Sequence, residues 1–146
     1  MARVEKQITI NATLDRVFSY LADFPRHSEW AQHRLKVEQT SQGPVGQGST
    51  FKSIGHQFGR DNEDTVTITE FVPNQKIVYE AMTKEGHFRH WVEFKPVDGG
   101  VQLAKGAQVL KMNFPLNVMF AIIGPFILPA GLNGDLKRIK AKLEGS

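Results

Sequence analysis

Residues 8–30 read ITINATLDRVFSYLADFPRHSEW, and the spacing of the apolar residues changes inside this stretch. Residues 4–10 alternate as in a β-strand, whereas the apolar residues of 14–21 recur at helical spacing. Thr13 is suited to cap the start of that helix, and Pro25 ends it because proline cannot donate to the helical hydrogen-bond ladder. The stretch therefore predicts a strand, an amphipathic helix and a second short helical turn after the proline.

Six further runs with strand character follow, and short turns rich in glycine or proline separate them. Such short connections suit antiparallel neighbours, because a parallel crossover needs about a dozen residues or more. We therefore expect a meander of six consecutive strands after the first one. The predicted strands are 34–38, 50–58, 65–72, 77–82, 88–95 and 101–110.

The C-terminal tail returns to helical spacing. Its apolar stripe consists of Leu132, Leu136, Ile139 and Leu143. Ahead of the stripe, residues 114–132 form a run of 19 residues without a charge, close to the roughly 20 residues that a transmembrane helix needs. Gly124, Pro125 and Pro129 interrupt that run, and the open face of a sheet needs a cover. We expect two helical pieces with a bend or loop between them, packed on the sheet, with membrane contact as the alternative.

The composition is that of an ordinary globular chain, with 146 residues, 40% hydrophobic residues and a formal net charge of +3. This length predicts one domain, residues 1–146. The absence of cysteine excludes disulfides, thiolate metal sites and cysteine nucleophiles, and fits a reducing compartment. Because the first residues also lack an apolar signal-like segment, we expect a cytoplasmic protein. The basic residues are scattered, so we expect no nucleic-acid partner.

Several short motifs, taken in order, resemble one known family. They are the opening stretch 8–30, VGQGSTF at 45–51, TEFVP at 69–73 and GGV at 99–101. Together they resemble the START-like (SRPBCC) superfamily, within it the polyketide cyclase/dehydrase-like group. The resemblance implies one α+β ligand-binding domain with the helix-grip fold. In that fold a curved antiparallel sheet of about seven strands surrounds a long C-terminal helix, and two short helices follow the first strand.

The resemblance also implies a function, because this superfamily uses an internal cavity for apolar molecules. We expect binding or transport of a small hydrophobic molecule, such as a lipid, a polyketide or an aromatic compound. One alternative is a polyketide cyclase/dehydrase-like enzyme in which a cavity histidine and lysine transfer protons. Another is a module that docks on a membrane or on a protein partner. We expect no cofactor, and the oligomeric state stays open.

One face of the predicted strand 88–95 is apolar except for a histidine. This face consists of Phe88, His90, Val92 and Phe94. His87 falls on the opposite face, so it cannot share a metal ion with His90. His90 is suited to orienting a ligand or moving a proton. The interpretation that we favour is a histidine in the core or at its rim that is hydrogen-bonded to a neighbour.

The last predicted strand places Lys105 in the middle of the apolar face that runs from Val101 to Val109. A buried lysine there is suited to act as a base, as a Schiff-base amine or as the anchor of an acidic ligand. The interpretation that we favour is a side chain that reaches the rim, or a bulge that turns it outward. Glu70 could join an acid–base set if it pointed inward, but we expect it to point outward.

These patterns give a set of candidate residues. If the protein is an enzyme, His90 and Lys105 are the catalytic candidates. The expected ligand contacts are Phe51, Phe88, His90, Val92, Phe94, Leu103, Lys105, Met119, Phe120, Ile123 and Phe126. Residues 120–128 are expected to form a mobile portal that Met119 and Phe126 line, with plain core packing as the alternative.

A group of potential metal ligands lies near the second short helix. It comprises His27, Glu29 and His33, close to Asp23. Two histidines six residues apart across a turn lack the fixed spacing of a helical metal site. We therefore expect no metal here, and we expect Trp30 to pack the short helix against the rim of the sheet.

Overall fold

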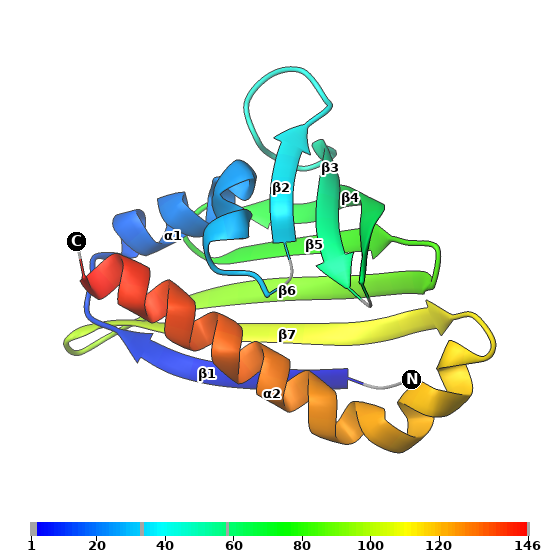
Figure 1. Cartoon of the computed structure of the whole chain (residues 1–146). Coiled ribbons are helices and arrows are strands. Elements are labelled where there is room, and N and C mark those ends of the chain that lie inside the picture. The colour runs from blue at the N-terminus through cyan, green and yellow to red at the C-terminus, as the bar shows by residue number, and fades with distance from the viewer. Residues whose placement is uncertain (1–2, 33, 58, 146) are drawn as a thin grey trace.

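The computed structural model describes residues 3–32, 34–57 and 59–145 (Figure 1). The chain begins with one strand and two short helices, continues through six strands and ends in a long helix. In order, the elements are β1 (Arg3–Ile10), α1 (Leu14–Ala22), the 3₁₀ helix η1 (Phe24–Glu29), β2 (Arg34–Gln39), β3 (Thr50–Gln57), β4 (Arg60–Val72), β5 (Lys76–Met82), β6 (Gly86–Val97), β7 (Gly100–Met112) and α2 (Leu116–Glu144).

The strands form one sheet of seven strands in the order β1-β7-β6-β5-β4-β3-β2, and all neighbours are antiparallel. The predicted meander and the α+β helix-grip architecture are confirmed. Several strands begin earlier than predicted, because the polar ends of the hairpins still pair through their backbones. Gln57 pairs with Arg60 next to the β3–β4 turn, and Gly86 pairs with Met112 at the start of β6. The predicted strand end at residue 58 lies outside the described residues.

The two short helices form as the opening stretch predicts. The Thr13 hydroxyl accepts a hydrogen bond from the backbone N–H of Arg16 at 3.3 Å, which caps α1. Pro25 lies at the start of η1, where its missing N–H leaves no helical hydrogen bond unmade. Phe24 and His27 of η1 are both buried, and Trp30, directly after η1, is buried with them. The packing of Trp30 is therefore confirmed, and it places an aromatic group over the sheet.

Of the bend or loop expected in the C-terminal helix, the loop is wrong and a bend is present. α2 is one helix of 29 residues, and Pro125 and Pro129 lie inside it. Each proline removes one backbone hydrogen bond and crowds the preceding turn, which bends a helix without ending it when the flanking residues keep helical geometry. Figure 1 shows the first turns of α2 at an angle to the rest. The predicted stripe on the second half is confirmed, since Leu132, Leu136, Ile139 and Leu143 are all buried.

The first half of α2 does not pack on the sheet as expected. Within residues 116–128, the buried or partly buried positions recur every four residues, at Leu116, Phe120, Gly124 and Leu128. The apolar side chains between them face solvent, with Ile122 69% and Phe126 77% exposed. The second half of α2 and η1 already cover the inner face of the sheet, which leaves no room for the first half. By length and composition α2 could cross a membrane.

Candidate functional site

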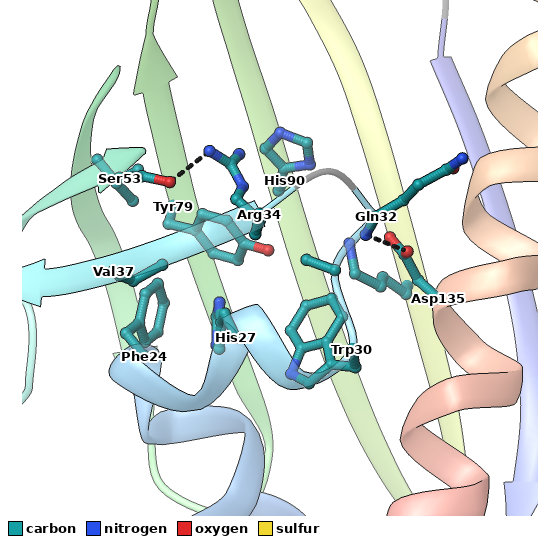
Figure 2. A pocket seen from close by; sticks show the side chains of 13 residues that line it. Phe24, His27, Trp30, Gln32, Arg34, Val37, Ser53, Tyr79, His90 and Asp135 are labelled. Carbon is teal, nitrogen blue, oxygen red and sulfur yellow. Dashed lines mark hydrogen bonds between the residues drawn. The ribbon is translucent and has the colours of Figure 1, made fainter. Parts of the chain in front are cut away.

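A cavity of about 170 Å³ lies on the inner face of the sheet, between η1, the start of β2 and the second half of α2 (Figure 2). Its walls combine aromatic rings with several polar and charged groups. The lining residues are Phe24, His27, Trp30, Ala31, Gln32, Arg34, Val37, Ser53, Val66, Tyr79, His90, Lys105 and Asp135. They come from strands β2 to β7 and from both helical layers, so the cavity exists only in the folded chain.

The sheet register brings Tyr79 of β5 beside His90 of β6. Their rings stack, with centroids 5.2 Å apart and planes 18° apart. Nδ1 of His90 is sealed from solvent and has no hydrogen-bond partner among the described residues, although part of the residue is accessible. Burial holds the pKa of His90 well below its usual value, and the charge of Lys105 lowers this pKa further. His90 is therefore a neutral imidazole in the cavity wall, with a buried Nδ1 whose hydrogen-bonding capacity no described residue uses.

His27 is the second buried histidine, and it is held by the backbone. Its Nε2 lies 2.8 Å from the Leu21 carbonyl oxygen, which can only accept, so Nε2 carries the proton. The ring stacks on Phe24 with centroids 4.1 Å apart and contacts the ring of Trp30 at 4.6 Å. Burial lowers the pKa of His27 to about 3, so this histidine is also neutral and forms part of an aromatic wall.

Lys105 faces the cavity and is only 3% exposed. The expectations that it reaches the rim or turns outward on a bulge are wrong, because β7 runs without a bulge at this position and pairs regularly with β1 and β6. The Lys105 ammonium lies 5.4 Å from the centroid of the Trp30 ring. Among the described residues, none offers it a hydrogen-bond acceptor or a carboxylate within 4.0 Å.

The other cation that lines the cavity has a counter-charge. Nη1 of Arg34 donates to the hydroxyl of Ser53 and, at 3.2 Å, to Oδ2 of Asp64. Burial raises the pKa of Asp64, and the Arg34 guanidinium opposes that rise. Arg34 is thus fixed against β3 and β4 by a partly buried ion pair.

The carboxylate of Asp135 is also occupied. Its Oδ1 accepts from Nη2 of Arg138 at 2.6 Å and from the backbone N–H of Gln32 at 3.2 Å. Arg138 in turn donates from Nε to the Trp30 carbonyl at 2.6 Å. These bonds tie the segment after η1 to α2, and they fix the position of the Trp30 ring in the cavity wall.

The structure places the predicted site residues in three groups. His90 and Lys105 line the cavity. Phe51, Val92, Phe94 and Leu103 lie in the hydrophobic core, and Phe88 is partly buried. Met119, Phe120, Ile123 and Phe126 lie on the first half of α2, away from the cavity lining.

The remaining candidates point elsewhere. Glu70 is exposed on the outer face of the sheet, 3.7 Å from the Lys76 ammonium, as expected. His87 lies on the face opposite to His90, with Nε2 2.7 Å from Oε1 of Glu80. Glu29 accepts hydrogen bonds from Tyr20 and Arg26 at the surface, whereas His27 is buried. His33 lies outside the described residues, and the described part of the chain contains no cluster of potential metal ligands.

Sequence reasoning missed several polar groups of the site. These are Arg34, Ser53, Tyr79 and Asp135. Ser53 and Tyr79 each occupy an inward position of an alternating strand, flanked by buried residues two positions away. That alternation could have identified them. Nothing in the local sequence predicts that Asp135 of α2 reaches the backbone of Gln32.

The chain matches the model of the family described as "Polyketide cyclase / dehydrase and lipid transport" over residues 1–144. No curated protein matches it. Among solved structures, it is similar to TTHA0849 from Thermus thermophilus, with a TM-score of 0.81 and 10% identity over 99% of this chain and 98% of that one. It is also similar to the ZhuI aromatase/cyclase from Streptomyces sp. R1128, with a TM-score of 0.80 and 18% identity over 98% and 93% of the two chains.

A third similar structure is the di-domain aromatase/cyclase StfQ from the steffimycin biosynthetic pathway. The TM-score is 0.76 and the identity 17%, and the match covers 98% of this chain and 50% of StfQ. At these identities the structures support the fold, while the family model covers nearly the whole sequence. The chain therefore belongs to the polyketide cyclase/dehydrase and lipid transport family.

Proposed function

We propose that the protein binds a small hydrophobic molecule in the cavity beneath η1. The observation that carries this proposal is the cavity itself, in which an aromatic wall of Phe24, His27 and Trp30 faces the polar groups of the sheet. Apolar walls with a few placed polar groups are the usual construction of a small-molecule site. The aromatic side supplies apolar contact, and the polar side orients the ligand.

The volume limits what the cavity can take as it stands. An engineered apolar cavity of about 150 Å³ holds a single benzene ring, and the 170 Å³ here is similar. We therefore propose a ligand portion of about one aromatic ring. A longer chain or a fused ring system would need the cavity to widen.

An enzyme of the cyclase type is the second candidate, and the unpartnered Nδ1 of His90 favours it. A neutral imidazole can take a proton from the carbon next to a bound carbonyl group. The electron pair of that C–H bond then forms an enolate, whose oxygen Lys105 would stabilise as an ammonium. In this mechanism His90 is the base and Lys105 stabilises the charge that develops in the transition state.

We further propose that the first half of α2 contacts a membrane surface. The portal predicted at residues 120–128 stays a prediction, because these residues do not line the cavity. The exposed apolar residues, such as Ile122 and Phe126, occupy most of the circumference of the helix. An exposed apolar surface of this kind, on a helix that the protein leaves uncovered, is typical of a helix that rests in the interfacial layer of a bilayer. Because the second half of α2 is charged and packs on the sheet, the helix lies on the bilayer rather than crossing it.

The charges near the start of α2 support contact with an anionic bilayer. Exposed Lys111 lies one residue before the end of β7 and five residues before α2 begins, and Asn113 donates to the carbonyl of exposed Lys84 at 2.7 Å. Both lysines therefore lie beside the apolar segment. Each cation near an anionic membrane contributes about 1 kcal/mol to binding.

Native mass spectrometry of freshly purified protein tests the main proposal. We expect a population heavier than the bare chain by the mass of a small apolar compound, which organic solvent then releases for identification. Protein that is purified gently, without detergent, and that neither carries such a compound nor takes one up from a panel of single-ring aromatics would contradict it. If a bound carbonyl compound loses water on incubation, the cyclase alternative is supported.

A further inference from the structure

The side chains around the cavity leave one positive charge without a counter-charge, and we infer that the ligand supplies the missing negative charge. The ligand is a small aromatic acid whose carboxylate pairs with the Lys105 ammonium while its ring lies against Trp30 and Phe24. This inference rests on the proposed function, since it names the class of molecule that the cavity binds.

Three charged side chains line the cavity, and two of them form ion pairs with side chains of opposite charge. Arg34 pairs with Asp64 at 3.2 Å, and Asp135 pairs with Arg138 at 2.6 Å. Lys105 has no carboxylate within 4.0 Å among the residues that the structure describes. One positive charge is therefore left over on the inner face of the sheet.

The Lys105 side chain is 3% exposed, and a buried ammonium is unfavourable unless hydrogen bonds replace the water that burial removes. The face of the Trp30 ring, 5.4 Å away, attracts the cation but accepts no hydrogen bond in the way an oxygen does. Both histidines in the wall are neutral, so neither competes with Lys105 for an anion. An anionic oxygen in the cavity would complete the site.

Two uncharged polar groups of the cavity wall have no hydrogen-bond partner among the described residues. Figure 2 shows the Tyr79 hydroxyl pointing into the cavity, and no described residue is hydrogen-bonded to it. Nδ1 of His90, on the ring stacked against Tyr79, is also without a partner. The Tyr79 hydroxyl can bond the second carboxylate oxygen or a ring hydroxyl, whereas Nδ1 of His90 is sealed from solvent and would need a small shift of the ring to do so. The indole nitrogen of Trp30 points away from His90 in Figure 2 and belongs to the packing around η1.

The aromatic part of the ligand follows from the opposite wall. Phe24 stacks on His27 and on Phe51, with centroids 4.1 and 4.6 Å apart, and this row continues to Trp30. Aromatic rings prefer such partners in stacked or edge-on geometry. With space for about one ring, the cavity suits a benzoate-like molecule better than a fatty acid.

Three probes of related shape test the inference by titration calorimetry at pH 7: benzoate, its uncharged isostere benzamide, and acetate, which keeps the charge without the ring. We expect benzoate to bind about tenfold more tightly than benzamide, as one charged hydrogen bond provides, and acetate to bind more weakly than benzoate. In Lys105→Met, the preference for benzoate over benzamide should disappear, because benzoate loses a charged partner whereas benzamide loses at most a hydrogen bond to its carbonyl oxygen. The matched control Lys95→Met, an exposed lysine of β6, should behave as wild type.

The outcomes separate this inference from the proposed function. Equal binding of benzoate and benzamide to wild type would overturn the acid inference and leave a hydrophobic site in place. Wild-type protein that binds neither ring compound would overturn the proposed function as well. If Lys105→Met does not fold, the wild-type comparison of the two isosteres decides alone.

Discussion

The ammonium of Lys105 and the indole ring of Trp30 face each other across the cavity, 5.4 Å apart. Lys105 belongs to β7, the strand next to the edge strand β1, and Trp30 belongs to the segment after η1 that Arg138 holds to α2. The contact therefore joins the sheet and both helical layers at one point. Apart from this ring, Lys105 has no counter-charge within 4.0 Å among the described residues, which is why we assign it to ligand binding.

Removing that charge should stabilise the protein without ligand. Lys105→Met keeps the length of the side chain and removes an unpartnered buried ammonium, so we expect the free energy of unfolding to rise by about 1 kcal/mol. Urea denaturation of the ligand-free protein measures this. The exposed control Lys95→Met should change it by less than about 0.5 kcal/mol. A clear loss of stability in Lys105→Met would show that Lys105 is a structural residue.

Arg138 should act on the cavity through Asp135 and Trp30. Arg138→Met removes the donor to the Trp30 carbonyl and frees the Asp135 carboxylate, so we expect unfolding to become easier by about 1–2 kcal/mol. The freed carboxylate would compensate Lys105 and weaken benzoate binding severalfold. Lys137→Met, at an exposed neighbouring position, is the control for both readouts. Unchanged benzoate affinity in Arg138→Met would contradict the charge balance described above.

The buried histidines should make the protein sensitive to acid. The folded pKa of His27, about 3, lies below the ordinary value of 6.5, so the unfolded chain binds more protons at pH values between these two. The stability that this difference contributes is complete above pH 6.5 and is lost as the pH falls toward 3. His90 acts in the same direction. Each histidine should contribute a slope of about 1.4 kcal/mol per pH unit below pH 6.

Urea denaturation between pH 7.5 and 5 measures this slope. His27→Leu loses the hydrogen bond to Leu21 and is less stable at neutral pH. The slope of its unfolding free energy against pH should nevertheless be smaller than that of wild type, by the contribution of one histidine. Ser19→Ala, an exposed change on α1, should keep the slope of wild type. A His27→Leu slope equal to that of wild type would mean that this histidine is not buried and neutral in the folded protein.

The exposed half of α2 should bind anionic vesicles. Ile122 and Phe126 are largely exposed, so the double variant Ile122→Ser/Phe126→Ser should fold as wild type but bind at least tenfold more weakly to vesicles containing phosphatidylglycerol. Lys137→Gln, on the second half of α2, is the control. Vesicle co-sedimentation measures binding, and hydrogen exchange measures the helix. Protection throughout residues 119–129 that vesicles and apolar ligands leave unchanged would contradict both membrane contact and the portal.

Local sequence patterns predicted what depends on neighbours in the chain. Alternation placed Lys105 and His90 on inward faces, and the change of spacing after Ile10 predicted α1 with its Thr13 cap. The break expected at Pro125 is wrong, because a proline removes only one helical hydrogen bond and the remaining hydrogen bonds of α2 keep the helix continuous.

Partners that are distant in the chain could not be predicted in this way. Whether Lys105 lies beside a carboxylate depends on how Asp135, 30 residues later, is held by Arg138. Alternation shows which way a side chain points, whereas charge balance appears only after the helices and the sheet are packed together.

A crystal structure of the protein with 4-bromobenzoate tests most directly whether the cavity is the binding site. The anomalous signal of bromine locates the ring without ambiguity. We expect bromine inside the cavity, with the carboxylate on the Lys105 ammonium and the ring against Trp30. Bromine only outside the cavity, for example in the groove around Trp91 on the outer face of the sheet, with the cavity unchanged, would contradict the account.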